Sequence, residues 1–176
     1  MSIHHRKNHL KEVFSSLFPS LPNRYIDIDI EKQVLYYVSF DSEPLTFPVS
    51  TSKFGIGSEE NSFKTPLGVH FICEKIGADY PSGTVFKSRK ATGQIWRNDF
   101  DQENMILSRI LRLKGLEPGK NAGAGIDSYQ RFIYIHGTNR EKQIGTPNSH
   151  GCVCMRNNDI IELFNLVEEG TIVNIS

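Results

Sequence analysis

Tyr25-Ile26-Asp27-Ile28-Asp29-Ile30 alternates along the chain with a period of two, the pattern expected of a β-strand. The segment 33–40 follows it and is rich in residues that favour strands. Only Glu31-Lys32 separates the two segments, and two strands joined by two polar residues are typical of a hairpin. We therefore expect the main body of the protein to begin with a β-hairpin.

Outward from this hairpin, short β-rich segments alternate with segments rich in Gly, Ser, Asn and Pro. We predict further strands at 45–49, 68–74, 105–113, 131–136 and 171–175, although the apolar residues of 105–113 would also suit a helix. Apolar residues at helical spacing predict two helices, one from Leu10 to Phe18 and one from Ile160 to Val167. Asn157 or Asn158 is expected to cap the second helix.

The predicted elements indicate a mainly β fold with short peripheral helices. The chain contains no internal repeat, low-complexity tract or clear linker. We divide it into an N-terminal helical extension, residues 1–24, and one main domain, residues 25–176. A chain of 176 residues is long enough to bury a core without disulfides or metals.

Charge and composition exclude several classes of protein. The 20 basic residues equal the 20 acidic residues in number, which argues against binding to nucleic acid or to a membrane surface. No apolar run approaches the roughly 20 residues of a membrane span, and the N-terminus lacks the order of a secretory signal. Three cysteines are an odd, sparse set that fits a reducing compartment. We expect a cytoplasmic protein if the chain is complete, and a periplasmic or cell-envelope protein if an export signal has been removed.

Reactive residue types are densest in two runs, 134–138 (Tyr-Ile-His-Gly-Thr) and 149–156 (Ser-His-Gly-Cys-Val-Cys-Met-Arg). A cysteine needs a nearby base or cation to react at neutral pH, because its ordinary pKa is about 8.5. His136 could serve Cys152 in this way. Gly151 lets the backbone approach a substrate, so successive N–H groups there could hold an oxyanion. A nucleophile, a base and an oxyanion site together indicate covalent acyl transfer.

The same residue types permit other sites. His136, His150, Cys152 and Cys154 are all zinc-type ligands, so a structural metal site is the main rival. Cys152 and Cys154 could instead form a redox pair, although a C-x-C segment in a regular strand is too tight for a relaxed disulfide. Residue types alone leave these alternatives open.

The run from His136 to Arg156 resembles the signature of the L,D-transpeptidase catalytic domain (YkuD-like) family, a His-Gly followed by Ser-His-Gly-Cys. Four further segments resemble family landmarks in family order, so that the resemblance covers about residues 25 to 175: Pro48-Val49-Ser50-Thr51, Thr65-Pro66-Leu67-Gly68, Leu107-Ser108-Arg109 and Ile144-Gly145. The resemblance implies the β-rich fold of that family, with residues 25–176 as its catalytic domain.

By this resemblance, Cys152 attacks the bond between diaminopimelate and D-alanine in a peptidoglycan stem peptide. His136 is the implied acid and base, and Gly151 and Cys152 are the implied oxyanion donors. Ser149 and His150 are expected to shape the loop and contact the substrate, and Tyr134 either lines the site or fills core. The acyl group would pass to an amine, as in an L,D-transpeptidase, or to water, as in an L,D-carboxypeptidase that recycles muropeptides. Neither a metal nor an organic cofactor is implied.

One position departs from the family pattern. Members usually carry Arg or Asn two residues after the nucleophile, and this chain has Cys154 there. A guanidinium can make two parallel hydrogen bonds to a carboxylate, which a thiol cannot. Arg156 is two residues further on and could reach the substrate or cap the following helix. A peptidoglycan-binding module without turnover is therefore the rival from another class. The sequence predicts nothing about the oligomeric state.

Overall fold

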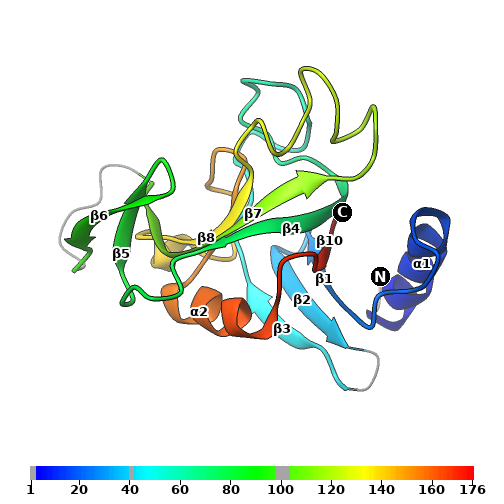
Figure 1. Cartoon of the computed structure of the whole chain (residues 1–176), viewed down its shortest axis with the longest axis horizontal. Coiled ribbons are helices and arrows are strands. Elements are labelled where there is room, and N and C mark those ends of the chain that lie inside the picture. Colours follow the sequence, from blue (N-terminus) through cyan, green and yellow to red (C-terminus); the bar gives the residue numbers. More distant parts are fainter. Residues whose placement is uncertain (1–2, 40–41, 98–103) are drawn as a thin grey trace.

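The computed structural model in Figure 1 describes residues 3–39, 42–97 and 104–176. Its helices are α1 (Ile3–Leu17), α2 (Asn157–Leu166) and the 3-10 helix η1 (Glu141–Gln143). Its strands are β1 (Arg24–Asp29), β2 (Val34–Ser39), β3 (Leu45–Pro48), β4 (Gly68–Ile76), β5 (Thr84–Lys87), β6 (Lys90–Ile95), β7 (Ile106–Gly115), β8 (Tyr134–Gly137), β9 (Val153–Met155) and β10 (Ile172–Ile175). The fold is mainly β, as predicted.

The strands form one curled sheet in the order β3-β2-β1-β10-β4-β7-β5-β6. Strands β8 and β9 leave this path, because β8 pairs with β7 on one side and with β9 on the other. Strand β10 lies between β1 and β4, parallel to β1 and antiparallel to β4, so the last strand of the chain is an inner strand of the sheet. The branch at β7 carries the segments that contain His136 and Cys152.

The predicted hairpin is present, with Tyr25 opposite Val38 in the antiparallel pair β1 and β2. Both faces of β1 are covered, so its two acidic residues are buried. Asp27 accepts a hydrogen bond from the Asn174 side chain at 2.9 Å, and Asp29 binds Lys32 Nζ at 3.0 Å. A buried carboxylate needs such partners, because its desolvation is otherwise costly.

Two hydrophobic clusters lie on opposite faces of the sheet. Helix α1 packs over one face, where the Phe14 ring meets the Tyr25 ring edge-on at 5.0 Å (Figure 1). Helix α2 contacts β7 and β8 and covers the main core on the other face. Neither helix combines the length and the apolar character that a membrane crossing requires, as far as the described residues extend.

The structure extends and corrects the sequence-based elements. Segment 105–113, which would also have suited a helix, forms strand β7, and β5, β6 and β9 were not predicted. Phe40, at the end of the second predicted strand, lies outside the described residues. The prediction that Asn157 or Asn158 caps α2 is wrong, because Arg156 is the N-cap residue and makes no side-chain cap bond. The Glu141 carboxylate accepts the Asn157 N–H instead, at 2.7 Å.

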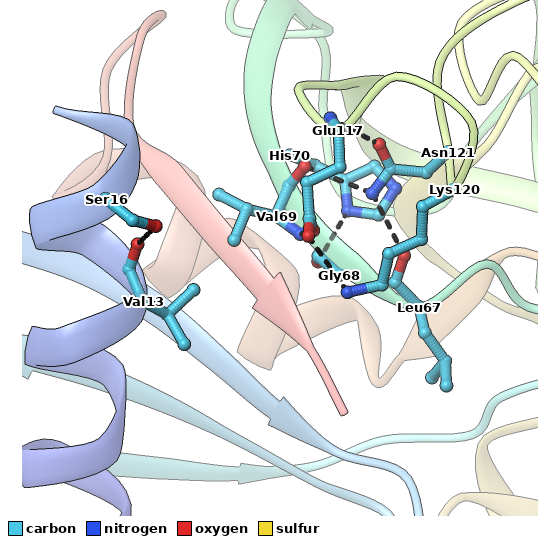
Figure 2. A network of polar contacts seen from close by, with 9 residues as sticks. All are labelled: Val13, Ser16, Leu67, Gly68, Val69, His70, Glu117, Lys120 and Asn121. Carbon is cyan, nitrogen blue, oxygen red and sulfur yellow. Dashed lines mark hydrogen bonds and ion pairs between the residues drawn. The ribbon is translucent and has the colours of Figure 1, made fainter.

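A network of polar contacts ties the segment 117–121 to the beginning of β4 (Figure 2). Asn121 donates from its amide to the carbonyls of Leu67 and Val69, and Glu117 accepts the Val69 N–H. The buried ring of His70 bonds to Gly68 O and to Ser128 Oγ, each at 3.0 Å. These bonds hold the segment 117–121 and Ser128 against the beginning of β4.

Candidate active site

His136 lies in β8, with only 2% of its surface exposed. Its Nδ1 is 2.8 Å from the carbonyl oxygen of Gly137, a geometry in which Nδ1–H is the donor. This backbone carbonyl is the orienting group that the sequence could not identify. Nε2 is left to accept a proton, and it lies 3.8 Å from Sγ of Cys154, the residue opposite His136 in the parallel pair β8 and β9.

Cys152 precedes β9 and is partly exposed, whereas Cys154 within β9 is completely buried. The Cys152 thiol lies 3.4 Å from the carbonyl oxygen of Phe132 and packs against the side-chain cluster that contains Tyr134. Among the contacts of the described residues, His136 touches the sulfur of Cys154 and not that of Cys152. The accessible thiol and the thiol beside the base are therefore different groups.

Burial keeps the thiols and the imidazole neutral. It raises the pKa of Cys152 to about 11, opposed by a backbone hydrogen bond from Tyr134 and the charge of Arg131. Burial and the neighbouring Cys152 raise the pKa of Cys154 to about 12. The pKa of His136 is lowered to about 4 by burial, partly offset by the Gly137 carbonyl. At pH 7 the site therefore holds a neutral base and a neutral thiol.

The loop before Cys152 is fixed by side-chain hydrogen bonds. Ser149 is buried, donates from Oγ to the carbonyl of Cys152 at 2.5 Å and accepts the Gly151 N–H at 3.3 Å. Thr65 donates to Gly151 O at 3.0 Å. Gly151 has a φ of 117°, and a Cβ there would lie 3.3 Å from the carbonyl oxygen of Lys64. Glycine is therefore required by the backbone conformation and by the close approach of residue 64.

This geometry bears on the expected oxyanion donors. The Gly151 N–H points to Ser149 Oγ, whereas the Cys152 N–H has no hydrogen-bond partner among the residues that the structure describes. Of the two amides, only that of Gly151 is thus already engaged in a hydrogen bond within the described residues. The oxyanion role of both amides stays a prediction.

The predicted substrate-binding residues occupy different places. Ser149 lies within the loop, and His150 packs beside the rings of Phe54 and Phe63, with centroids at 5.5 and 5.9 Å. Tyr134 has 5% of its surface exposed and lies beside Cys152. Arg156 is at the N-cap of α2, where its Nη1 is 3.8 Å from Asp159 Oδ2. Their contacts with substrate stay predictions.

Sequence reasoning missed several residues that position the site. Thr65 lies in Thr65-Pro66-Leu67-Gly68, one of the segments that resemble the family, so the sequence contained a signal although no role was assigned to it. Phe132 and Arg131 carried none: Phe132 offers only its backbone carbonyl to Cys152, and Arg131 donates to the carbonyls of Gly57 and Lys64. In the described part of the chain, no three His, Cys, Asp or Glu side chains are arranged to hold a metal ion.

The comparisons with known proteins agree with this architecture. A family model described as the L,D-transpeptidase catalytic domain (YkuD) matches residues 23–175. The probable L,D-transpeptidase YcfS of Escherichia coli is 27% identical over 91% of this chain and 46% of its own length. The putative L,D-transpeptidase YkuD of Bacillus subtilis is 45% identical over 34% of this chain and 37% of its own. The matched part of the chain thus spans less than half of these curated relatives.

Solved structures show the same fold. An L,D-transpeptidase from Mycobacterium smegmatis superposes with a TM-score of 0.55 at 19% identity, over 88% of this chain and 58% of that one. The catalytic domain of the Enterococcus faecium L,D-transpeptidase gives 0.53 at 18% identity, over 89% of this chain and 99% of that one. Because the family model covers most of the sequence and the folds agree, this chain belongs to the L,D-transpeptidase catalytic domain (YkuD) family.

Proposed function

We propose that this chain cleaves the bond between diaminopimelate and D-alanine in peptidoglycan stem peptides through an acyl-enzyme on Cys152. The observation that carries the proposal is the partly exposed Cys152 thiol, set on a hydrogen-bonded loop one strand away from a neutral, oriented His136. A nucleophile must meet its substrate, so the partly exposed Cys152 suits the role better than the completely buried Cys154.

Acylation begins with both groups neutral. Cys152 turns from Phe132 O toward His136 and passes its proton to Nε2 while the sulfur attacks the substrate carbonyl carbon. The electron pair of the carbonyl moves onto oxygen, and the Cys152 N–H stabilises that negative charge. The Gly137 carbonyl supports the imidazolium that forms, because it accepts the hydrogen bond from Nδ1–H.

Collapse of the tetrahedral intermediate breaks the carbon–nitrogen bond. The imidazolium returns its proton to the departing amino group of D-alanine, and a thioester on Cys152 remains. An acceptor amine or water then attacks the thioester and gives a proton to His136. The thiolate leaves and takes that proton back, which restores the starting state.

The acceptor divides the proposal into two activities. An amine of another stem peptide gives a cross-link, which is L,D-transpeptidation. Water gives a tripeptide, which is L,D-carboxypeptidation. We keep both, since the site residues described above act in the same way on either acceptor.

The proposal is tested by incubating a purified tetrapeptide muropeptide with the wild type and with Cys152→Ala, and identifying the products by mass spectrometry. The wild type should release D-alanine and yield a tripeptide, a cross-linked dimer or both. Cys152→Ala should yield neither. Cys73→Ala is the matched control, because Cys73 lies in β4 with its thiol on Arg112 O, and it should act as the wild type does.

Two results would count against the proposal. Turnover by Cys152→Ala would assign the chemistry to another group. A wild type that binds the muropeptide without turnover and without an adduct on Cys152 would instead indicate the binding module.

A further inference from the structure

The hairpin of β5 and β6 ends in a turn with an unusual backbone. Lys87 pairs with Lys90, so that Ser88 and Arg89 form the turn, with φ values of 48° and 66°. Positive φ at both central residues is the mark of a type I′ turn, in which Asn and Gly are preferred. Residues of other types keep this conformation only where their surroundings hold it.

Contacts of Arg89 explain what holds the turn. Its Nη1 donates to Tyr134 Oη at 3.2 Å, and its guanidinium carbon lies 5.1 Å from the centroid of the Phe132 ring. Phe132 itself has a φ of 57°, and its carbonyl oxygen is the partner of the Cys152 thiol at 3.4 Å. The guanidinium thus contacts Phe132 and Tyr134, the two residues that lie beside the Cys152 side chain in space.

The same strand that supports His136 also positions the hairpin. Val85 and Phe86 pair with Leu107 and Ile106 of β7, and the Gly83 N–H donates to Ser108 Oγ at 2.9 Å. Strand β7 also pairs with β8, from Leu107 to Arg112. Arg89 is therefore held in register with the site and is not on an independent loop.

The positive charge of Arg89 is not neutralised within the described residues. Glu74 is the carboxylate that acts on it through space, and Glu74 forms its salt bridge with Arg112 at 2.8 Å. No described carboxylate forms a salt bridge with Arg89. A guanidinium has five N–H donors in a planar fork, which matches the two oxygens of a carboxylate. Donors thus remain for a ligand at the place where Arg89 meets Phe132 and Tyr134.

From this geometry we propose that Arg89 binds a substrate carboxylate next to the scissile bond and sets the preference of the site for acidic substrates. The inference rests on the proposed function and adds a binding group to it. Cys154 is a neutral thiol, and the guanidinium of Arg89 brings a positive charge from the hairpin turn to Phe132 and Tyr134. Two carboxylates flank the scissile bond: that of the departing D-alanine and that of the diaminopimelate side chain.

Three matched substrates distinguish which of the two carboxylates Arg89 binds: the tetrapeptide muropeptide, its D-alaninamide form and its diaminopimelate carboxamide form. We expect Arg89→Gln to lower kcat/KM at least tenfold on the parent substrate, chiefly through KM. On the amide that lacks the bound carboxylate, the variant and the wild type should agree within about twofold. On the parent substrate, the kcat/KM of Arg89→Lys should lie between those of Arg89→Gln and the wild type, because lysine keeps the charge and loses the planar fork. The exposed Lys90→Gln is the matched control and should act as the wild type does.

Binding to Cys152→Ala, measured by calorimetry with and without Arg89→Gln, keeps the test independent of turnover. Arg89→Gln should weaken binding of the parent substrate and leave that of one amide unchanged. An equal loss on all three substrates would show that Arg89 only holds the turn, and no loss on any would show that it does not bind substrate. Absence of turnover by the wild type, with charge-dependent binding preserved, would overturn the proposed function and not this inference.

Discussion

At the scale of single residues, burial decides the protonation of the site. Burial disfavours the charged forms of the His136 ring and of the partly exposed Cys152 thiol, so the two pKa values move apart, to about 4 and about 11. A thiolate–imidazolium pair in the resting enzyme would need the reverse order. The proton must therefore move as the sulfur attacks.

This order predicts the pH dependence of thiol alkylation. At pH 7 a thiol with a pKa of about 11 is thiolate in roughly one molecule in 10⁴, and that fraction rises tenfold with each pH unit. The rate of iodoacetamide reaction at Cys152, followed by peptide mapping in Cys154→Ser, should accordingly climb tenfold per unit from pH 7 to 10. A rate that is constant above pH 6 would show a preformed ion pair.

At the scale of elements, the beginning of α2 depends on a carboxylate from outside the helix. Glu141 in η1 accepts hydrogen bonds from Asn157 N and from Asn157 Nδ2, both at 2.7 Å. The Asn157 side chain is committed elsewhere, because its Nδ2 also donates to Thr138 O and its Oδ1 accepts from Ser108 Oγ. Glu141 thus caps the helix N-terminus in place of the Asn157 side chain, which was predicted to do so.

Neutralising this cap should weaken the fold measurably. We expect Glu141→Gln to lower the free energy of unfolding by about 1 kcal/mol, because an anion at a helix N-terminus is lost. Glu162→Gln, an exposed change of the same kind within α2, should have no effect. Urea unfolding at pH 7 measures both, and equal stability of the two variants would disprove the capping role.

Periodicity explains which elements the sequence could predict. The alternation of β1 and the helical spacing of α2 were readable in the sequence, whereas β2 was predicted from its many residues that favour strands. Strand β6 is exposed along almost its whole length, and a strand without a buried face has no alternation to detect. Strand β9 has only three residues, all buried, which is too short for a period.

The residues of the site also differ in whether the sequence could predict them. Reactive residue types singled out His136 and Cys152 as candidates. The structure gives Gly151 a positive φ directly before Cys152, whereas its oxyanion role stays a prediction. Arg89 could not be found from the sequence, because its relation to Cys152 arises from tertiary contacts with Phe132 and Tyr134. The contact of His136 with Cys154 follows from the register of β8 and β9, which no local pattern specifies.

At the scale of the whole molecule, two buried histidines couple folding to pH. Burial lowers the pKa of His70 and of His136 from 6.5 to about 4. The unfolded chain binds these protons more readily than the folded protein does, so acid favours unfolding. The folded state is therefore most stable above pH 6.5 and loses stability as the pH falls from 6.5 toward 4.

The loss should be large enough to measure. Each histidine contributes about 1.4 kcal/mol per pH unit in this window, so the free energy of unfolding should fall by about 4 kcal/mol between pH 7 and pH 5. His70→Gln removes one of the two groups and should halve the dependence. Urea titrations at the two pH values provide the test, and a wild type equally stable at both would show that the histidines are not buried as neutral rings.

The identity of the nucleophile is the central claim, because His136 touches Cys154 while Cys152 is the accessible thiol. The most direct measurement is the intact mass of the wild type, Cys152→Ser and Cys154→Ser, quenched in acid during incubation with the tetrapeptide muropeptide. We predict an adduct on the wild type and on Cys154→Ser and none on Cys152→Ser. An adduct that persists on Cys152→Ser and disappears in Cys154→Ser would contradict the account.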